Sequence, residues 1–244
     1  MNCILCQKPK KLCDSHIIAE FFYKLIYDDL SRRRIEPFKA LTPDKHERPM
    51  QKGPRSPLLC EECEGKRNTH FETPMKEYWV DIDPLQVLEN SSSATIRGID
   101  YASFKLFHLS VLLCAHYAAE RTRDSFFATV KLSDADLISI HEMWDKREAG
   151  PYWKYPIVAS AILEPDDNGG VWRELITSPL PATDSTGKAY ILFCFGGCQW
   201  RYYLTPVLTP WIESRCLKED GSMFIEKREW EPMQMCAELV AQAN

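Results

Sequence analysis

Apolar residues recur at helical spacing, every third or fourth position, in four stretches of the chain. These stretches cover residues 17–30, 64–79, 101–121 and 133–146. Asp14 and Ser15 precede the first stretch as candidate N-caps, and Ser133 precedes the last. Pro74 would kink or end the second helix, because proline lacks an amide hydrogen. The pattern therefore predicts four helices within the first 150 residues.

The pattern changes after residue 150, where short β-prone runs alternate with turns rich in glycine and aspartate. The predicted strands cover 156–163, 171–176, 189–195, 199–204 and 222–227. A closing helix is predicted over 231–243. Short strands at this spacing are typical of an antiparallel meander, so we expect an α+β protein with a C-terminal antiparallel β-sheet.

The composition is that of a folded globular chain, with 45% hydrophobic and 27% charged residues among 244. No run approaches 18 apolar residues, so no transmembrane helix is expected. The first residues lack the basic and apolar regions of a secretory signal, and we expect a cytoplasmic protein. Ten cysteines are too few for a disulfide scaffold, and clustered cysteines in a reducing compartment indicate metal binding.

Four cysteines form two CxxC pairs, Cys3 with Cys6 and Cys60 with Cys63. Each pair can present two thiolates to one Zn²⁺, and two pairs complete its tetrahedron, so a structural zinc site is predicted. The alternative is a set of free thiols or a redox pair, but redox chemistry needs only one CxxC motif. Cys13 is a spare thiol nearby that could replace one ligand.

The residues around these pairs resemble the zinc-containing, treble-clef type of HNH (His-Me finger) endonucleases. The matching features are the first CxxC pair, the run His16-Ile17-Ile18, and a second CxxC pair followed by Glu64. The resemblance covers about residues 1–80. The stretch 98–110 also looks like a segment of uncharacterised bacterial proteins that carry this N-terminal pattern.

The resemblance implies a zinc treble clef with an HNH-like ββα arrangement and phosphodiester hydrolysis, in a setting such as bacterial genome defence. His16 would be the general base, since its ordinary pKa lies near 6.5. Asp14 or Ser15 stands where a neighbouring metal ligand stands, and Glu64 where the helix ligand stands. Those residues would hold a catalytic Mg²⁺ or Mn²⁺. His70 and Glu72, further along the helix, could assist.

Several departures from the HNH pattern favour an alternative, a non-catalytic zinc module that binds a protein or nucleic-acid partner. Serine precedes His16 where active families have aspartate or histidine, no asparagine occurs between His16 and Cys60, and Glu64 replaces the usual histidine. In that case His16 orders the turn at a helix start, and Glu64 complements a helix dipole. Both interpretations stay open at this stage.

A basic segment separates the two CxxC pairs. From Arg32 to Arg55 eight basic residues face only three acidic ones, and four prolines favour an extended loop. The candidates for phosphate contacts are Arg32, Arg33, Arg34, Lys45, Arg48, Lys52 and Arg55. The alternative is a solvated loop whose charge offsets the acidic C-terminal half.

The expected organisation is a zinc-binding HNH-like module over 1–80, a helical segment over 81–150 and a β-rich region over 151–244. A nucleic acid would bind the first range, and a protein partner could bind 81–244. His108 and His116 lie eight residues apart on one predicted helix, a spacing that favours core or interface positions over a metal pair.

Overall fold

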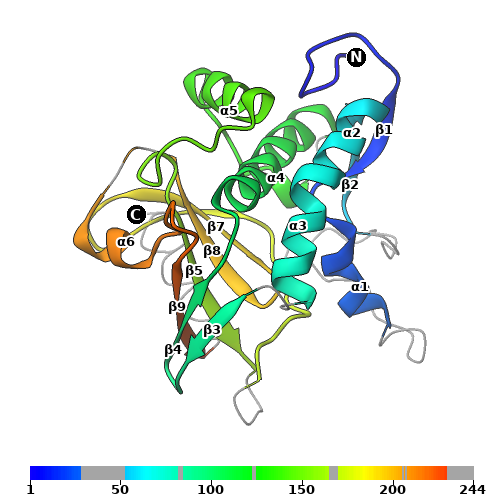
Figure 1. The fold of residues 1–244 in the computed structure, drawn as a ribbon. Coiled ribbons are helices and arrows are strands. Elements are labelled where there is room, and N and C mark those ends of the chain that lie inside the picture. The colour runs from blue at the N-terminus through cyan, green and yellow to red at the C-terminus, as the bar shows by residue number, and fades with distance from the viewer. Residues whose placement is uncertain are drawn as a thin grey trace.

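A computed structural model describes residues 1–28, 53–81, 85–122, 125–164, 170–204, 206 and 208–229. It is an α+β structure, with the N-terminal cysteines and most helices on one side and a seven-stranded sheet on the other (Figure 1). The closing helix predicted over 231–243 lies outside the described residues, as does the basic loop from Arg32 to Lys52.

The N-terminal region is built on a two-stranded antiparallel sheet. Strand β1 (Leu12–His16) pairs with β2 (Arg55–Cys60), and helix α2 (Glu61–Arg67) begins directly after β2. Helix α1 (Glu20–Asp28) follows β1. The prediction that Asp14 and Ser15 cap this helix is wrong, because both residues lie within β1 and the helix begins at Glu20.

Helix α2 continues through wide turns to residue 81. It passes into the π-helical turn η1 (Asn68–Glu72), then α3 (Thr73–Lys76) and the π-helical turn η2 (Glu77–Asp81). Pro74 stands at the start of α3, where a missing amide hydrogen costs little. At the position where a kink or an end was expected, the helix changes from the π-helical η1 to the α-helical α3.

Helix α4 (Tyr101–Thr122) is the central helix of the fold. Its residues 104–116 are all buried, as expected for a helix that is apolar on every side. The 3₁₀ turn η3 (Ser125–Phe127) leads to α5 (Asp134–Lys146), which packs on α4. Ser133 and Asp136 form a capping box at its start, and this confirms the predicted cap at Ser133.

The C-terminal half forms a mixed sheet. Its strands are β3 (Gln86–Glu89), β4 (Ser93–Arg97), β5 (Ile157–Leu163), β6 (Leu180–Thr183), β7 (Ala189–Phe195), β8 (Cys198–Tyr203) and β9 (Met223–Glu229). They lie in the order β3-β4-β9-β5-β8-β7-β6. The short helix α6 (Pro210–Arg215) stands between β8 and β9 in the chain.

The prediction of a purely antiparallel sheet is corrected by one pairing, because β9 runs parallel to β5. The chain reaches β9 through α6 rather than a tight hairpin, and such a longer connection allows parallel neighbours. The run 171–176 is no strand and makes only an isolated bridge at Val171. Strands β3 and β4 join the sheet from a range predicted to be helical.

One continuous cluster of buried side chains joins the two sides of the molecule, from Cys3 to Ile225. The Phe22 and Phe195 rings meet edge to face at 5.0 Å, and the Trp79 indole donates a 2.8 Å hydrogen bond to the Gly196 carbonyl. The N-terminal region is therefore packed on the sheet through α1, η2 and α4. The division at residues 80 and 150 stays a prediction.

Candidate metal centre and adjoining hollow

Four cysteine side chains converge at one end of the β1–β2 pair. Cys3 and Cys6 come from the turn before β1, Cys60 ends β2, and Cys63 lies one turn into α2. Their sulfur atoms all lie within 4.8 Å of one another. Within the described ranges, no other group of histidine, cysteine, aspartate and glutamate converges in this way.

Backbone hydrogen bonds hold the first cysteine pair in position. The Gln7 amide donates to the Cys3 carbonyl at 2.9 Å, and Gln7 has a positive φ of 59° that tightens this turn. The Ile4 amide donates to the Leu58 carbonyl at 3.0 Å, and the Cys60 amide donates to the Cys3 sulfur at 3.3 Å. Amide donors to sulfur are a usual feature of sites that hold thiolates.

The chemistry of this cluster suits zinc. Cys3, Cys60 and Cys63 are buried and Cys6 is half-buried, and burial raises the pKa of the Cys63 thiol. Four thiolates this close would repel one another strongly unless a cation lay between them. A tetrahedral all-sulfur set is the preferred structural site of Zn²⁺. The four predicted ligands are thus brought together, and the cluster indicates a zinc site.

The other described cysteines lie outside this cluster. Cys13 is half-buried on β1, and four more are buried in the core, namely Cys114, Cys194, Cys198 and Cys216. Cys13 stands near the cluster without belonging to it. The spacing argument therefore selected the right four thiols.

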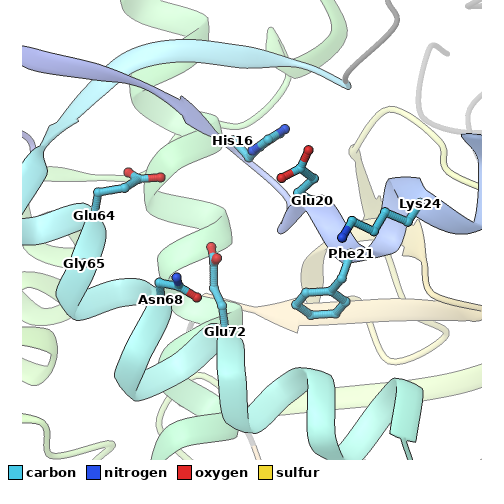
Figure 2. A pocket seen from close by; sticks show the side chains of 8 residues that line it. All are labelled: His16, Glu20, Phe21, Lys24, Glu64, Gly65, Asn68 and Glu72. Carbon is cyan, nitrogen blue, oxygen red and sulfur yellow. The ribbon is translucent and has the colours of Figure 1, made fainter.

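A hollow of about 320 Å³ opens beside the β1–α1 junction and the face of α2 and η1. Its lining residues are His16, Glu20, Phe21, Lys24, Glu64, Gly65, Asn68 and Glu72 (Figure 2). Glu64, Asn68 and Glu72 follow one another at intervals of four residues, so they lie on one face of the helical run. His16 and Glu20 face them from the end of β1 and the start of α1 (Figure 2).

Glu64 is held in the hollow by Ser15. The Ser15 hydroxyl donates a 2.6 Å hydrogen bond to a Glu64 carboxylate oxygen and accepts one of 3.3 Å from the Leu59 amide. Asp14, the other residue predicted beside the metal, is exposed on β1 and is not among the described residues that line the hollow. Ser15, rather than Asp14, is the neighbour of His16 that contacts the helix.

His16 is half-buried and ends β1. The Arg55 guanidinium donates a 2.9 Å hydrogen bond from its Nε to the imidazole Nε2 of His16. Arg55 also lies 3.8 Å from a Glu20 carboxylate oxygen. The Tyr23 ring stacks near the imidazole, with ring centroids 6.1 Å apart. Arg55, predicted as a phosphate contact, therefore lies at the imidazole itself.

A buried arginine contacts two of the residues that line the hollow, His16 and Glu72. Arg67 is only 1% exposed, and its guanidinium donates to the backbone carbonyls of His16 at 2.6 Å and Ile17 at 2.8 Å. Its Nε lies 3.2 Å from the Ser110 hydroxyl and 3.3 Å from a Glu72 carboxylate oxygen. Burial raises the pKa of Glu72, and the charge of Arg67 opposes that rise.

Glu20, Lys24 and Asn68 were not predicted as lining residues. For Asn68 the sequence does contain a signal, since Asn68 and Glu72 follow Glu64 at helical spacing. Glu20 and Lys24 carry no such signal, because only the tertiary placement of α1 brings them to the hollow. His70, predicted as a helper, is half-buried on η1 and is not part of the described lining.

The two other histidines of interest belong to the core. His108 is fully buried among Phe104, Phe195 and Trp200, and its Nδ1 shares a 2.8 Å hydrogen bond with the Tyr202 hydroxyl. His116 is also buried, and its Nδ1 accepts from the Leu132 amide at 3.3 Å. The prediction of core positions for both is confirmed.

No protein-family model matches this chain, and neither a curated protein nor a solved structure was found to match it significantly. No helix among the described residues is both long and apolar enough to cross a membrane. The argument for function therefore rests on the site itself.

Proposed function

We propose that this protein is a metal-dependent nucleic-acid endonuclease of the HNH type, with a structural zinc in a treble clef. One observation carries the proposal: His16 and three carboxylates line a single hollow beside the four-cysteine cluster. The carboxylates are Glu20, Glu64 and Glu72. A histidine facing oxygen ligands is the combination that phosphodiester hydrolysis requires, a base on one side and a hard cation on the other.

Each side chain has a defined task in this proposal. His16 removes the proton from the water that attacks phosphorus. Glu64 would hold Mg²⁺ or Mn²⁺ together with Asn68 and Glu72, and these oxygen donors fit such an ion. A cation held there would supply positive charge to stabilise the leaving oxygen. Ser15 and Arg67 keep Glu64 and Glu72 aimed at the hollow.

The basic loop adds a means of binding the substrate. In the sequence it follows α1, whose residues Glu20, Phe21 and Lys24 line the hollow, and it leads into β2. Its residues Arg32, Arg33, Arg34, Lys45, Arg48 and Lys52 are proposed phosphate contacts. Arg55, at the start of β2, is the member of the set that lies beside His16. A role in bacterial genome defence follows from the resemblance to HNH proteins.

The test is cleavage of plasmid DNA and of RNA in Mg²⁺ or Mn²⁺ by the wild type and by His16→Ala. Loss of a general base costs about 10²–10⁴-fold in rate, so cleavage by the variant should fall by that factor. His141→Ala is the matched control, because His141 lies on α5 outside the hollow and hydrogen-bonds Gln7. Equal cleavage by His16→Ala and His141→Ala would rule out the proposed base.

The second candidate is a non-catalytic zinc module that binds a nucleic acid or a protein. It is favoured by the Arg55 hydrogen bond to His16, which occupies a nitrogen that a base needs, and by serine beside His16. In this case the wild type would bind nucleic acid without cutting it under any divalent cation. Binding lost in an Arg32, Arg33, Arg34 triple alanine variant would then assign the loop to recognition.

A further inference from the structure

The contact between Arg55 and His16 crosses the β1–β2 pair. The two residues are direct cross-strand neighbours, with His16 at the end of β1 and Arg55 at the start of β2. The Arg55 Nε lies 2.9 Å from His16 Nε2, and its Nη2 lies 3.8 Å from Glu20 Oε1. The Arg55 side chain remains 26% exposed, and both of its contacts, His16 and Glu20, line the hollow.

This contact defines the state of the imidazole. A guanidinium group is protonated at every accessible pH and can only donate hydrogen bonds. His16 Nε2 must therefore be the acceptor, so the ring is neutral and carries its proton on Nδ1. The lone pair on Nε2, which would take a proton from water, is occupied by Arg55.

Neither of the two contacts that Arg55 makes is as strong as a close, forked contact with a phosphodiester would be. The imidazole is neutral, and the Glu20 contact is long and half exposed, where ion pairs contribute little. A phosphodiester oxygen is charged and accepts guanidinium donors in a forked geometry. Rotation about the outer side-chain bonds can turn the same donors from the ring to a phosphate at the mouth of the hollow.

We propose that Arg55 is a substrate-responsive guard on His16. Without substrate its guanidinium blocks the Nε2 lone pair, and a phosphodiester that enters the hollow attracts Arg55 and frees the nitrogen. The inference rests on the proposed function and deepens it, because it makes the base available only when a nucleic-acid backbone is bound. Arg55 thus binds the phosphate of the substrate and, in its absence, blocks the lone pair of the base.

The first test observes the contact in the wild-type protein and uses a variant only to assign the signal. Nitrogen NMR of histidine-labelled, zinc-loaded protein near pH 8 distinguishes the two tautomers, and His16→Ala assigns the signal. In the free protein, the His16 ring should carry its proton on Nδ1, and its Nε2 should accept a hydrogen bond. A short DNA duplex added without Mg²⁺ or Mn²⁺ should shift the Arg55 Nε–H and His16 Nε2 resonances together. A proton on Nε2 in the free protein would overturn the proposal.

The second test measures access to the lone pair. Diethyl pyrocarbonate modifies a neutral imidazole nitrogen, and mass spectrometry locates the adduct. His16 in Arg55→Gln should react roughly tenfold faster or more than in the wild type, the effect of removing a hydrogen bond from a charged donor. Lys66→Gln is the control, because Lys66 pairs with Glu62 outside the hollow. Circular dichroism and zinc content verify folding of each variant.

The outcomes separate this inference from the nuclease proposal. An accepting Nε2 that duplex DNA leaves unchanged would refute the guard even if the protein cleaves DNA. Equal modification of His16 in Arg55→Gln and wild type would also refute it. If the duplex shifts the Arg55 and His16 resonances together but no cation supports cleavage, the release of His16 by a phosphate backbone stands and the nuclease proposal falls.

Discussion

The Ser15 hydroxyl donates a 2.6 Å hydrogen bond to the Glu64 carboxylate, which joins β1 to α2 across 49 residues of sequence. Ser15 is fully buried and also accepts from the Leu59 amide, so one hydroxyl connects both strands of the pair and the helix. A serine beside His16 is a poor cation ligand compared with aspartate. Its task in this protein is to orient the carboxylate that faces the hollow.

Ser15→Ala is expected to lower the free energy of unfolding by about 1–3 kcal/mol, because it leaves the buried Leu59 amide without an acceptor. Urea unfolding followed by circular dichroism measures this. Ser56→Ala is the matched control. Ser56 is the cross-strand neighbour of Ser15 and is equally buried, but its hydroxyl has no hydrogen-bond partner among the described residues. A loss as large in Ser56→Ala would show that the hydrogen bonds of Ser15 are not the cause.

Purified protein is expected to contain one Zn²⁺ per chain. Cys60→Ser should release it and loosen the β1–β2 pair, because three thiolates leave an open coordination position. Metal analysis and zinc release to a chelator provide the measurement. Cys13→Ser, which alters a thiol outside the cluster, should retain the metal. Zinc-free wild type, or full retention in Cys60→Ser, would contradict the assigned ligands.

Glu64→Gln is expected to weaken Mn²⁺ binding in the hollow and to reduce cleavage by about 10²-fold, because one negative charge facing the cation is lost. Mn²⁺ binding can be followed by paramagnetic resonance without reference to activity. Glu61→Gln removes an equal charge from an exposed position on the same helix and is the control. Unchanged Mn²⁺ affinity in Glu64→Gln would exclude this carboxylate as a ligand.

The buried His108 is expected to make stability depend on pH. Burial lowers its pKa well below the ordinary 6.5, so the unfolded chain binds a proton that the folded protein excludes. Its contribution is fully present above about pH 6.5 and declines as the pH falls, by up to about 1.4 kcal/mol per unit.

Urea unfolding of wild type and His108→Gln between about pH 5 and pH 7 tests this dependence. Glutamine can keep a hydrogen bond to the Tyr202 hydroxyl but does not titrate. In the variant, the free energy of unfolding should depend much less on pH. The dependence that remains should be the part due to His141, whose pKa is also lowered by burial. Identical slopes in both proteins would mean that His108 is not the titrating group.

Local sequence patterns were sufficient for several elements of this structure. The CxxC spacing identified the two cysteine pairs, because a short turn brings residues three apart to one point, whereas pairing of β1 with β2 brings the two pairs together. The strand over 189–195 coincides with β7, and Ser133 caps α5 as expected. In each case the determining interactions lie within a few residues.

Long-range packing decided the rest. Asp14 and Ser15 are residue types that commonly cap helices, yet both lie in a strand that pairs with β2. Cross-strand hydrogen bonds outweigh the local preference. The parallel pairing of β5 with β9 likewise depends on where the chain returns after α6.

The sequence by itself determined the two CxxC turns and the main helices, because these depend on spacing over short distances. The tertiary structure alone decided what surrounds His16. Arg55 reaches the imidazole through strand register, Glu20 through the packing of α1, and Glu64 through its contact with Ser15. Contacts between residues some 40 to 50 positions apart follow from the relative placement of whole elements, which no local pattern encodes.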